Sequence, residues 1–297
     1  EAELDAEGEK ARKARAAKDA ARAAPAAPRA PAIRREVPAP TVPSTERAIL
    51  ESIPLDDVWP WLNPQMLYGK HLGLKGHVGR LAEAGDAKYV MLEEAVHAMQ
   101  EHARAGGMHV RGVYRFFPAS AAGDRVRVFD PDSGNDVASF DFPRQARGDG
   151  LCVADFVGAQ DDHVAFFVVT AGEGIRAEVG RLREQGHYLE SHVLGALAVE
   201  TAEAAAEWLH AELRAQWGFA DAPGMTMADR FRCAYRGSRY SFGYPACPDL
   251  EEQVKLFELL QPEAIGVTLT DGWMMDPEAS VSAFVVHHPD ARYFAAP

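Results

Sequence analysis

The side chains best suited to binding chemistry are concentrated in residues 235–248, which contain two arginines, two glycines, two prolines and four aromatic residues. Glycine permits backbone angles that other residues resist, whereas proline fixes its own φ and removes a hydrogen-bond donor. We therefore expect a rigid, irregular loop here, and neither a helix nor a central strand. In such a loop the guanidinium of Arg239 would bind a carboxylate through parallel donors, and the rings would offer stacking surfaces. Composition alone favours the alternative, a structural loop with a buried arginine.

A second group of ionisable side chains lies in residues 188–217, whose apolar positions recur at helical spacing and predict one long helix. Glu200, Glu203 and Glu207 are three and four residues apart, so they share one face of that helix. The simplest interpretation is an acidic face exposed to solvent, and we adopt it for Glu200 and Glu207. The predicted buried stripe of the helix comprises Leu189, Val193, Leu197, Ala204, Trp208 and Leu209.

Two further carboxylates, Asp56 and Asp57, lie at the start of a short helical segment predicted within residues 52–62. The dipole of a helix favours negative charge in its first turn. On local grounds alone, this is the simplest role for both aspartates.

Composition and charge exclude several classes of function. A net charge of −13 argues against broad binding to nucleic acids or anionic membranes. No apolar run approaches the ~18 residues that a membrane-spanning helix needs. The three cysteines are widely spaced, which indicates a reducing, cytoplasmic compartment and no disulfide framework. The sequence has no C-x-x-C or H-E-x-x-H motif, and the adjacent His287 and His288 would point to opposite faces of a strand, so we expect no bound metal.

The N-terminal part of the chain differs in composition from the rest. Residues 1–24 are mostly alanine and charged residues, which predict a solvated helix, and residues 25–43 contain six prolines, which predict a stiff linker. We interpret residues 1–43 as a tether to another domain upstream, and a disordered tail is the alternative. The chain begins at Glu1 and not at methionine, so we also expect it to be part of a longer protein. Residues 44–297 would form the folded domain.

Within that domain, predicted strands follow one another after short turns. Strands in such close succession pair antiparallel, and helices packed on a largely antiparallel sheet give an α+β fold. The most apolar segment, residues 163–170, should be the central strand. The other predicted strands are residues 47–51, 111–117, 125–130, 137–142, 265–270, 280–287 and 291–294. The other predicted helices are residues 86–105, 227–235 and 250–260, and the last would begin with a capping box formed by Asp249 and Glu252.

The motif Arg239-x-x-x-Gly243-Tyr-Pro-Ala-Cys-Pro248 resembles the signature of the activation domain of cobalamin-dependent methionine synthase. Residues 112–118 and 287–294 are similar to the same family at corresponding points, and the resemblance runs from about Ser44 to the C-terminus. It implies a single C-shaped domain with a central twisted, largely antiparallel sheet flanked by helices.

That family binds S-adenosylmethionine, and the resemblance implies which residues of this chain would bind it. They are Asp57, Glu203, Arg239, Gly243, Tyr244, Tyr293 and Phe294. An arginine suits the carboxylate of this ligand, and acidic side chains suit its ammonium and sulfonium groups. Two positions depart from the family pattern: Cys233 replaces an acidic residue found in some members, and Phe294 replaces a tyrosine.

The resemblance further implies a reactivation module of cobalamin-dependent methionine synthase, the methyltransferase that makes methionine from homocysteine. Cobalamin bound by a neighbouring domain would be reduced by flavodoxin or a similar reductase, and S-adenosylmethionine would supply the methyl group. Methyl transfer by in-line displacement needs positioning and no general base, so we assign no catalytic residue.

Two alternatives remain open, a stand-alone S-adenosylmethionine-binding module without a corrinoid partner and a docking domain without a ligand. If an acidic reductase docks here, it requires a local basic rim despite the negative net charge. The candidates for that rim are Lys70, Arg236, Arg239 and Arg292.

Overall fold

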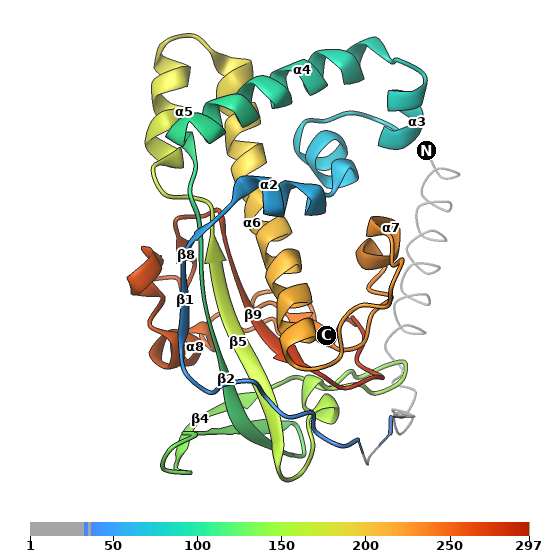
Figure 1. The fold of residues 1–297 in the computed structure, drawn as a ribbon, viewed down its shortest axis with the longest axis vertical. Coiled ribbons are helices and arrows are strands. Elements are labelled where there is room, and N and C mark those ends of the chain that lie inside the picture. Colours follow the sequence, from blue (N-terminus) through green and yellow to red (C-terminus); the bar gives the residue numbers. More distant parts are fainter. Residues whose placement is uncertain (1–32, 35–36, 297) are drawn as a thin grey trace, which may run out of the picture.

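The computed structural model describes residues 33–34 and 37–296 (Figure 1). The helix expected in residues 1–24 lies outside the described residues, as does most of the proline-rich segment. The described end of that segment contacts the domain, because the Trp217 indole donates to the carbonyl oxygen of Pro40 at 3.3 Å and the Arg34 guanidinium pairs with Asp290 at 2.8 Å. This part of the expected tether therefore runs along the surface of the domain.

One antiparallel sheet of seven strands forms the centre of the fold (Figure 1). Its strands lie in the order β4-β3-β2-β5-β9-β6, and β1 pairs with β2 off that path. Their bounds are Ala48–Ile53 (β1), Val110–Ala122 (β2), Arg125–Phe129 (β3), Asp136–Asp141 (β4), Asp162–Thr170 (β5), Ser238–Tyr240 (β6) and Ser280–Val286 (β9). Strand β5 pairs with β2 and β9, and all its residues except His163 are buried, so its prediction as the central strand is confirmed. The α+β class and the antiparallel sheet are confirmed as well.

The sheet separates two hydrophobic cores, because successive side chains of a strand point to opposite faces. Phe116 and Phe167 belong to one core, whereas their chain neighbours Phe117 and Phe166 belong to the other. Three helices cover the first core: α4 (Ala87–His102), α5 (Ile175–Glu184) and α6 (Tyr188–Gln216). Helix α8 (Gln253–Leu260) helps to close the second.

Helix α6 runs alongside the sheet (Figure 1). Several of its polar side chains line the pocket described below. Most of its predicted buried stripe is buried, but Leu189 in the first turn is exposed and Trp208 is only half-buried. His210 and Arg214 are fully buried, which the apolar pattern did not predict. The helix is rich in alanine, and these small side chains let neighbouring segments approach it on more than its apolar side.

Short helical elements connect the main layers. They are α2 (Leu55–Val58), η1 (Trp59–Trp61), η2 (Gln65–His71), α3 (Val78–Glu83), η3 (Ala103–Gly107), η4 (Val153–Phe156), α7 (Met227–Phe231) and η5 (Pro262–Ile265). Neither η2, which is a π-helical turn, nor α3 was predicted from the sequence. Such short elements offer little apolar periodicity, and contacts with the rest of the fold decide their conformation.

The stretch 235–248 is irregular as expected, except that Ser238–Tyr240 forms the edge strand β6 against β9. Gly237 makes this pairing possible. Its φ is +82°, and a β-carbon there would lie 2.7 Å from the carbonyl oxygen of Val286. Only glycine permits both that angle and that approach.

The predictions for the C-terminal strands are partly wrong. Residues 291–294 form no strand in the described structure. Of residues 265–270, only Thr268–Leu269 (β7) is a strand, and it pairs with Met275–Asp276 (β8) in a separate two-stranded sheet. The turn of η5 occupies the start of the predicted strand, because Pro262 favours the first turn of a helix.

The predicted capping box at residues 249–252 is also wrong. Helix α8 begins later, at Gln253, and its N-cap residue Glu252 makes no capping side-chain hydrogen bond within the described chain. Asp249 instead accepts from the amide of Glu251 at 2.9 Å in a turn before the helix. Helix α7 likewise ends at Phe231, four residues earlier than the prediction of 227–235.

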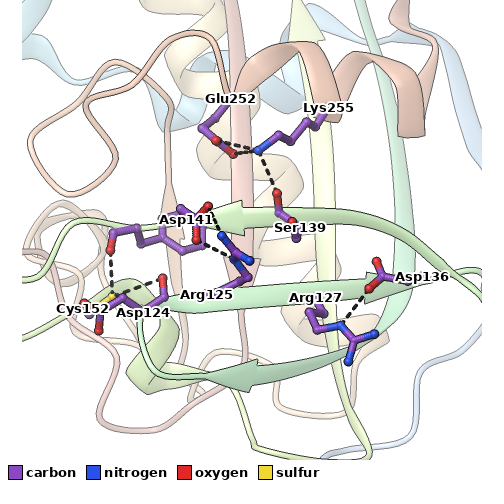
Figure 2. Close-up of polar contacts among 10 residues, drawn as sticks. Asp124, Arg125, Arg127, Asp136, Ser139, Asp141, Cys152, Glu252 and Lys255 are labelled. Atoms are coloured by element: carbon purple, nitrogen blue, oxygen red, sulfur yellow. Dashed lines mark hydrogen bonds and ion pairs between the residues drawn. The ribbon is translucent and has the colours of Figure 1, made fainter.

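Figure 2 shows the polar contacts that join the β3–β4 hairpin internally and to α8. Arg127 and Asp136 pair across the hairpin at 2.7 Å, with both side chains half-exposed. Lys255 of α8 donates to the carbonyl oxygen of Ser139 in β4 at 2.8 Å and pairs with Glu252 at 2.6 Å. These contacts dock α8 on the edge of the sheet.

A buried ion-pair network joins α6 to α7. Arg214 is fully buried, and its Nε and Nη2 atoms bind Oδ1 of Asp221 at 2.9 and 2.7 Å. Arg230 of α7 binds the other oxygen, Oδ2, through Nε at 2.9 Å. The Arg214 guanidinium also lies 3.8 Å from the centre of the Tyr235 ring. One carboxylate therefore holds α7 against α6.

We expect Asp221→Ala to lower the free energy of unfolding by about 3–5 kcal/mol, because it leaves the buried guanidinium of Arg214 without its counter-charge. Urea unfolding followed by circular dichroism measures this change. Asp136→Ala is the control, since it breaks a half-exposed pair and should cost less than about 1 kcal/mol. Equal costs for the two variants would contradict a structural role for Asp221.

Candidate functional site

A pocket of about 380 Å³ lies between α6 and the segments packed on its acidic face. Helix α6 contributes Glu200, Glu203 and Glu207, and β6 contributes Arg239. Val199 and Ala204 of α6 also line it. The other lining residues come from η1, η2, α7 and the loops beside them: Trp61, Asn63, Met66, Lys70, His71, Arg230, Phe231, Cys233 and Tyr244. The pocket thus combines acidic, basic and aromatic side chains from segments far apart in the sequence.

Arg239 lies between two carboxylates of α6. Its Nε donates to Glu207 at 3.3 Å and its Nη2 donates to Glu203 at 3.4 Å. Burial alone would lower the pKa of Arg239, but Glu203 and Glu207 raise it above its ordinary value. Both contacts are longer than the about 2.7–2.9 Å typical of charge-assisted hydrogen bonds, so the guanidinium is paired but not tightly bound.

Tyr244 also contacts Glu203, one of the two carboxylates that bind Arg239. Its hydroxyl donates to Oε1 of Glu203 at 3.2 Å, and the negative charge of Glu203, followed by burial, raises the pKa of Tyr244 to about 12. Gly243 shapes the turn before it, with a φ of +82° and a β-carbon position only 2.7 Å from the Leu250 side chain. Its amide donates to the carbonyl oxygen of Cys247 at 2.8 Å. Gly243 therefore positions Tyr244 through the backbone.

Glu200 forms a separate pair with His71 of η2. The two side chains meet at 2.9 Å between Nε2 of His71 and Oε1 of Glu200, and Glu200 is only 3 % exposed. Burial, together with the nearby charge of Glu203, raises the pKa of Glu200 to about 7. Burial, together with the positive charge of Lys70, lowers the pKa of His71. At neutral pH His71 is therefore a neutral hydrogen-bond donor to Glu200 and supplies no full counter-charge.

The expectation that Glu200 and Glu207 form a solvated acidic face is wrong. Glu200 is buried under η2, and the side chain of Glu207 is 12 % exposed beside Arg239. The local sequence of a helix does not show what packs on its polar face. Here η2 is joined to α6 by the His192 ring, whose Nε2 bonds the carbonyl oxygen of His71 at 3.1 Å. The side chain of Gln65 joins η2 to α3 and to the segment before it.

Arg239 neighbours a buried cluster that contains His210, Tyr235 and Arg214. The ring of His210 packs edge-on against Tyr235 with 5.2 Å between centroids, and neither nitrogen of His210 has a hydrogen-bond partner in the described structure. Burial, with the neighbouring Arg214 and Arg239, keeps the pKa of His210 well below its ordinary value. A neutral His210 thus supports the Arg239 region without adding charge.

The remaining predicted site residues lie outside the pocket lining. Asp57 is exposed on α2, and it does not reach the pocket among the described residues. Phe294 is a core residue, with its ring 6.1 Å from that of Tyr240. Tyr293 is 53 % exposed, close enough to Tyr244 to contribute to the raised pKa of that residue. The structure therefore brings together Glu203, Arg239 and Tyr244, with Tyr293 near them.

The four basic residues proposed for a docking rim do not form one exposed surface. Lys70 lines the pocket and is exposed, and Arg292 is exposed but pairs with Asp149 at 2.9 Å. Arg236 is partly buried and donates to the carbonyl oxygen of His287 at 2.9 Å, and Arg239 is occupied as described above.

Sequence reasoning did not assign His71, Arg230 or Glu200 to the site. For Glu200, the spacing of three residues from Glu203 was a usable signal, because it places both carboxylates one turn apart on the same face. His71 and Arg230 lie on short elements without apolar periodicity, so their positions depend on the tertiary fold. Cys233, at the position where some family members carry an acid, is exposed and lines the pocket.

Across residues 33–34 and 37–296, no cluster of three or more histidine, cysteine or acidic side chains is arranged to hold a metal ion. In the same residues, no helix is both long and apolar enough to cross a membrane.

Comparisons with known proteins agree on one family. The model of the family "Vitamin B12 dependent methionine synthase, activation domain" matches residues 60–297. A methionine synthase of Mycobacterium leprae is 41 % identical over 201 residues, which cover 61 % of this chain and 16 % of that protein. A methionine synthase of Mycobacterium tuberculosis is 34 % identical over 283 residues, covering 87 % of this chain and 23 % of that protein. The chain therefore spans less than a quarter of the length of either relative.

A solved structure of the same kind resembles the fold closely. It is a MetH reactivation domain bound to AdoHcy, with a TM-score of 0.81 and 26 % sequence identity. The similarity covers 88 % of this chain and 84 % of that one.

The buried Glu200 should make stability depend on pH. The pKa of a free glutamate is about 4.3 and that of folded Glu200 is about 7, so between these values the folded state binds more protons and stability falls as the pH rises. Glu200→Gln, which imitates the protonated side chain, should be about 3–4 kcal/mol more stable than wild type at pH 8 and only about 1 kcal/mol more stable at pH 5. Urea unfolding at both pH values measures this, and a pH-independent difference would refute the titration of Glu200.

Proposed function

Because the chain belongs to the family of vitamin B12-dependent methionine synthase activation domains, we propose that it binds S-adenosylmethionine in the pocket beside Arg239. In this proposal the chain is a reactivation module, and it presents the methyl donor to cobalamin held by a neighbouring domain. The relatives it matches are methionine synthases, which supports a corrinoid partner over a stand-alone sensor.

The observation that carries the proposal is the pairing of one guanidinium with two carboxylates at the wall of a pocket. The amino-acid end of S-adenosylmethionine bears a carboxylate and an ammonium group, which match Arg239 and an acid such as Glu203. Since the contacts of Arg239 are longer than 3.2 Å, the guanidinium can exchange them for a bidentate bond to the ligand carboxylate. The pocket volume of about 380 Å³ is within the range of small-molecule sites.

The reaction would require positioning from these residues and no proton transfer. Arg239 and Glu203 would hold the amino-acid end of the donor, and Tyr244, which keeps its proton because of its raised pKa, would hold Glu203 in place. Cobalamin held by a neighbouring domain would supply the nucleophile. Orientation of this kind can account for much of the rate of a displacement reaction. Phe231 and Tyr244 are exposed at the pocket, which leaves an apolar face for a large partner.

We further propose the partners and compartment that this role requires. They are the cobalamin-binding domain of a longer methionine synthase and flavodoxin or a similar reductase as the electron donor. The free thiols of Cys152 and Cys247 are buried, and the raised pKa that burial gives them keeps both unreactive. Free thiols support a reducing compartment such as the cytoplasm.

We expect calorimetric titration of the chain with S-adenosylmethionine to show one binding site. Arg239→Ala should weaken binding by about 2–4 kcal/mol, because it removes a charge-assisted bond and leaves Glu203 and Glu207 uncompensated. Arg239→Lys should also weaken it, since a point charge does not replace a planar fork. Arg176→Ala, which breaks an exposed pair with Asp276, is the matched control and should leave affinity unchanged. If Arg239→Ala lowers only the melting temperature and binding stays normal, Arg239 is a scaffold residue.

The role in reactivation is tested in a full-length methionine synthase that carries this domain. With oxidised cobalamin, a reductant and methyl-labelled S-adenosylmethionine, the Arg239→Ala enzyme should transfer label to cobalamin at least about tenfold more slowly than wild type. Turnover that starts from methylcobalamin should be unchanged, because it does not use this pocket. Equal labelling of cobalamin in both enzymes would refute the proposed role.

A further inference from the structure

Glu200 is the pocket carboxylate whose charge is least compensated. Glu203 and Glu207 share the guanidinium of Arg239, whereas Glu200 pairs, within the described chain, only with the neutral ring of His71. The positive charge of the nearby Lys70 offsets burial only in part, because the pKa of Glu200 is still raised to about 7. A poorly compensated buried carboxylate is costly, so it either takes up a proton or awaits a cation. With 3 % exposure, Glu200 cannot rely on solvent for that compensation.

The position of Glu200 relative to Glu203 suggests which cation it would meet. The two residues are three apart on α6, which separates them by about 4.5 Å along the helix axis. In S-adenosylmethionine, two methylene groups separate the α-carbon from the sulfur. If the amino-acid end is held at Arg239 and Glu203, the sulfur extends about one helical turn along the pocket. Glu200 lines that same pocket one turn from Glu203.

We propose that Glu200 recognises the positive sulfonium of S-adenosylmethionine and that His71 is the residue that positions it. The inference rests on the proposed binding of this ligand beside Arg239. In this proposal, Glu200 distinguishes the charged methyl donor from the neutral thioether product, S-adenosylhomocysteine. The Nε2–H of His71 contacts the Glu200 carboxylate at 2.9 Å. His71 is held in turn by the hydrogen bond between Nε2 of His192 and the His71 carbonyl oxygen.

Recognition of a cation by Glu200 links binding to proton release. Burial gives free Glu200 a pKa of about 7, and a cation beside it favours the ionised form, so the carboxyl proton passes to the solvent on binding. Affinity for S-adenosylmethionine should therefore rise with pH between about 6 and 8. The other titratable and charged groups around the pocket are His71 and Lys70 on η2, Glu203 and Glu207 on α6, Arg230 on α7, Arg239 on β6, and Cys233 and Tyr244 on the loops.

The test measures the affinities of wild type and Glu200→Gln for both ligands by calorimetry at pH 6, 7 and 8. We expect Glu200→Gln to weaken S-adenosylmethionine by about tenfold at pH 8 and S-adenosylhomocysteine by less than about threefold. Titrations in buffers of different ionisation enthalpy should show proton release with S-adenosylmethionine and wild type, and none with the variant. Glu212→Gln is the control, because it removes the same charge from an exposed position of the same helix.

His71 is tested through the pH profile, which a purely structural role would not move. His71→Leu removes the donor to Glu200 and should shift the rise in S-adenosylmethionine affinity to higher pH, whereas His71→Gln, which keeps an N–H donor, should restore most of the wild-type profile. Equal loss of both ligands in Glu200→Gln, or no loss of either, overturns the proposal. Wild type that binds neither ligand overturns the proposed function instead, so the two failures are distinguishable.

Discussion

The need to give each buried ionisable side chain of α6 a polar partner holds the site together. Transfer of an ionised side chain from water to the interior costs several kcal/mol unless a partner meets it. Arg239 from β6 meets Glu203 and Glu207, Asp221 from the loop after α6 meets Arg214, and the neutral ring of His71 from η2 gives Glu200 a hydrogen bond. Elements with few apolar residues of their own, such as η2 and α7, are thus fixed on the helix by polar contacts. The pocket is the space that remains between them.

Much of the fold could be predicted, because its strands have strong apolar patterns and close spacing. The central strand, the antiparallel sheet and the long helix α6 follow from local sequence, since each buries its own apolar side chains. The weaker predictions failed where local and tertiary preferences compete. The helical turn that begins at Pro262 extends to Ile265, the first residue of the strand predicted over residues 265–270, and the turn at Asp249 delays the start of α8.

The sequence predicted the constrained loop of the site, residues 235–248, but it did not predict the burial of the acidic face of α6. Glycines and prolines around Arg239 indicated a constrained loop, and the structure shows the reason in the positive φ of Gly237 and Gly243. The burial of Glu200 was not predictable from its helix, because it depends on a π-helical turn that has no sequence period. Asp57 was a candidate through resemblance alone; it is exposed on α2 outside the pocket lining, and its role in ligand binding stays a prediction. The ligand roles of Glu203, Arg239 and Tyr244 stay predictions, supported by their convergence.

The hydrogen bond between Glu200 and His71 also affects how the proposed site would release its product, S-adenosylhomocysteine. A pocket with equal affinity for donor and product would release the product slowly. Binding energy that is the same for both ligands does not promote their exchange. Methyl transfer removes the positive charge from sulfur, and a carboxylate with a pKa of about 7 then regains a proton at little cost near neutral pH. A glutamate paired to an arginine would keep its charge and could not respond in this way. In the proposed site, the neutral His71 partner would therefore let Glu200 favour the charged donor and still release the uncharged product.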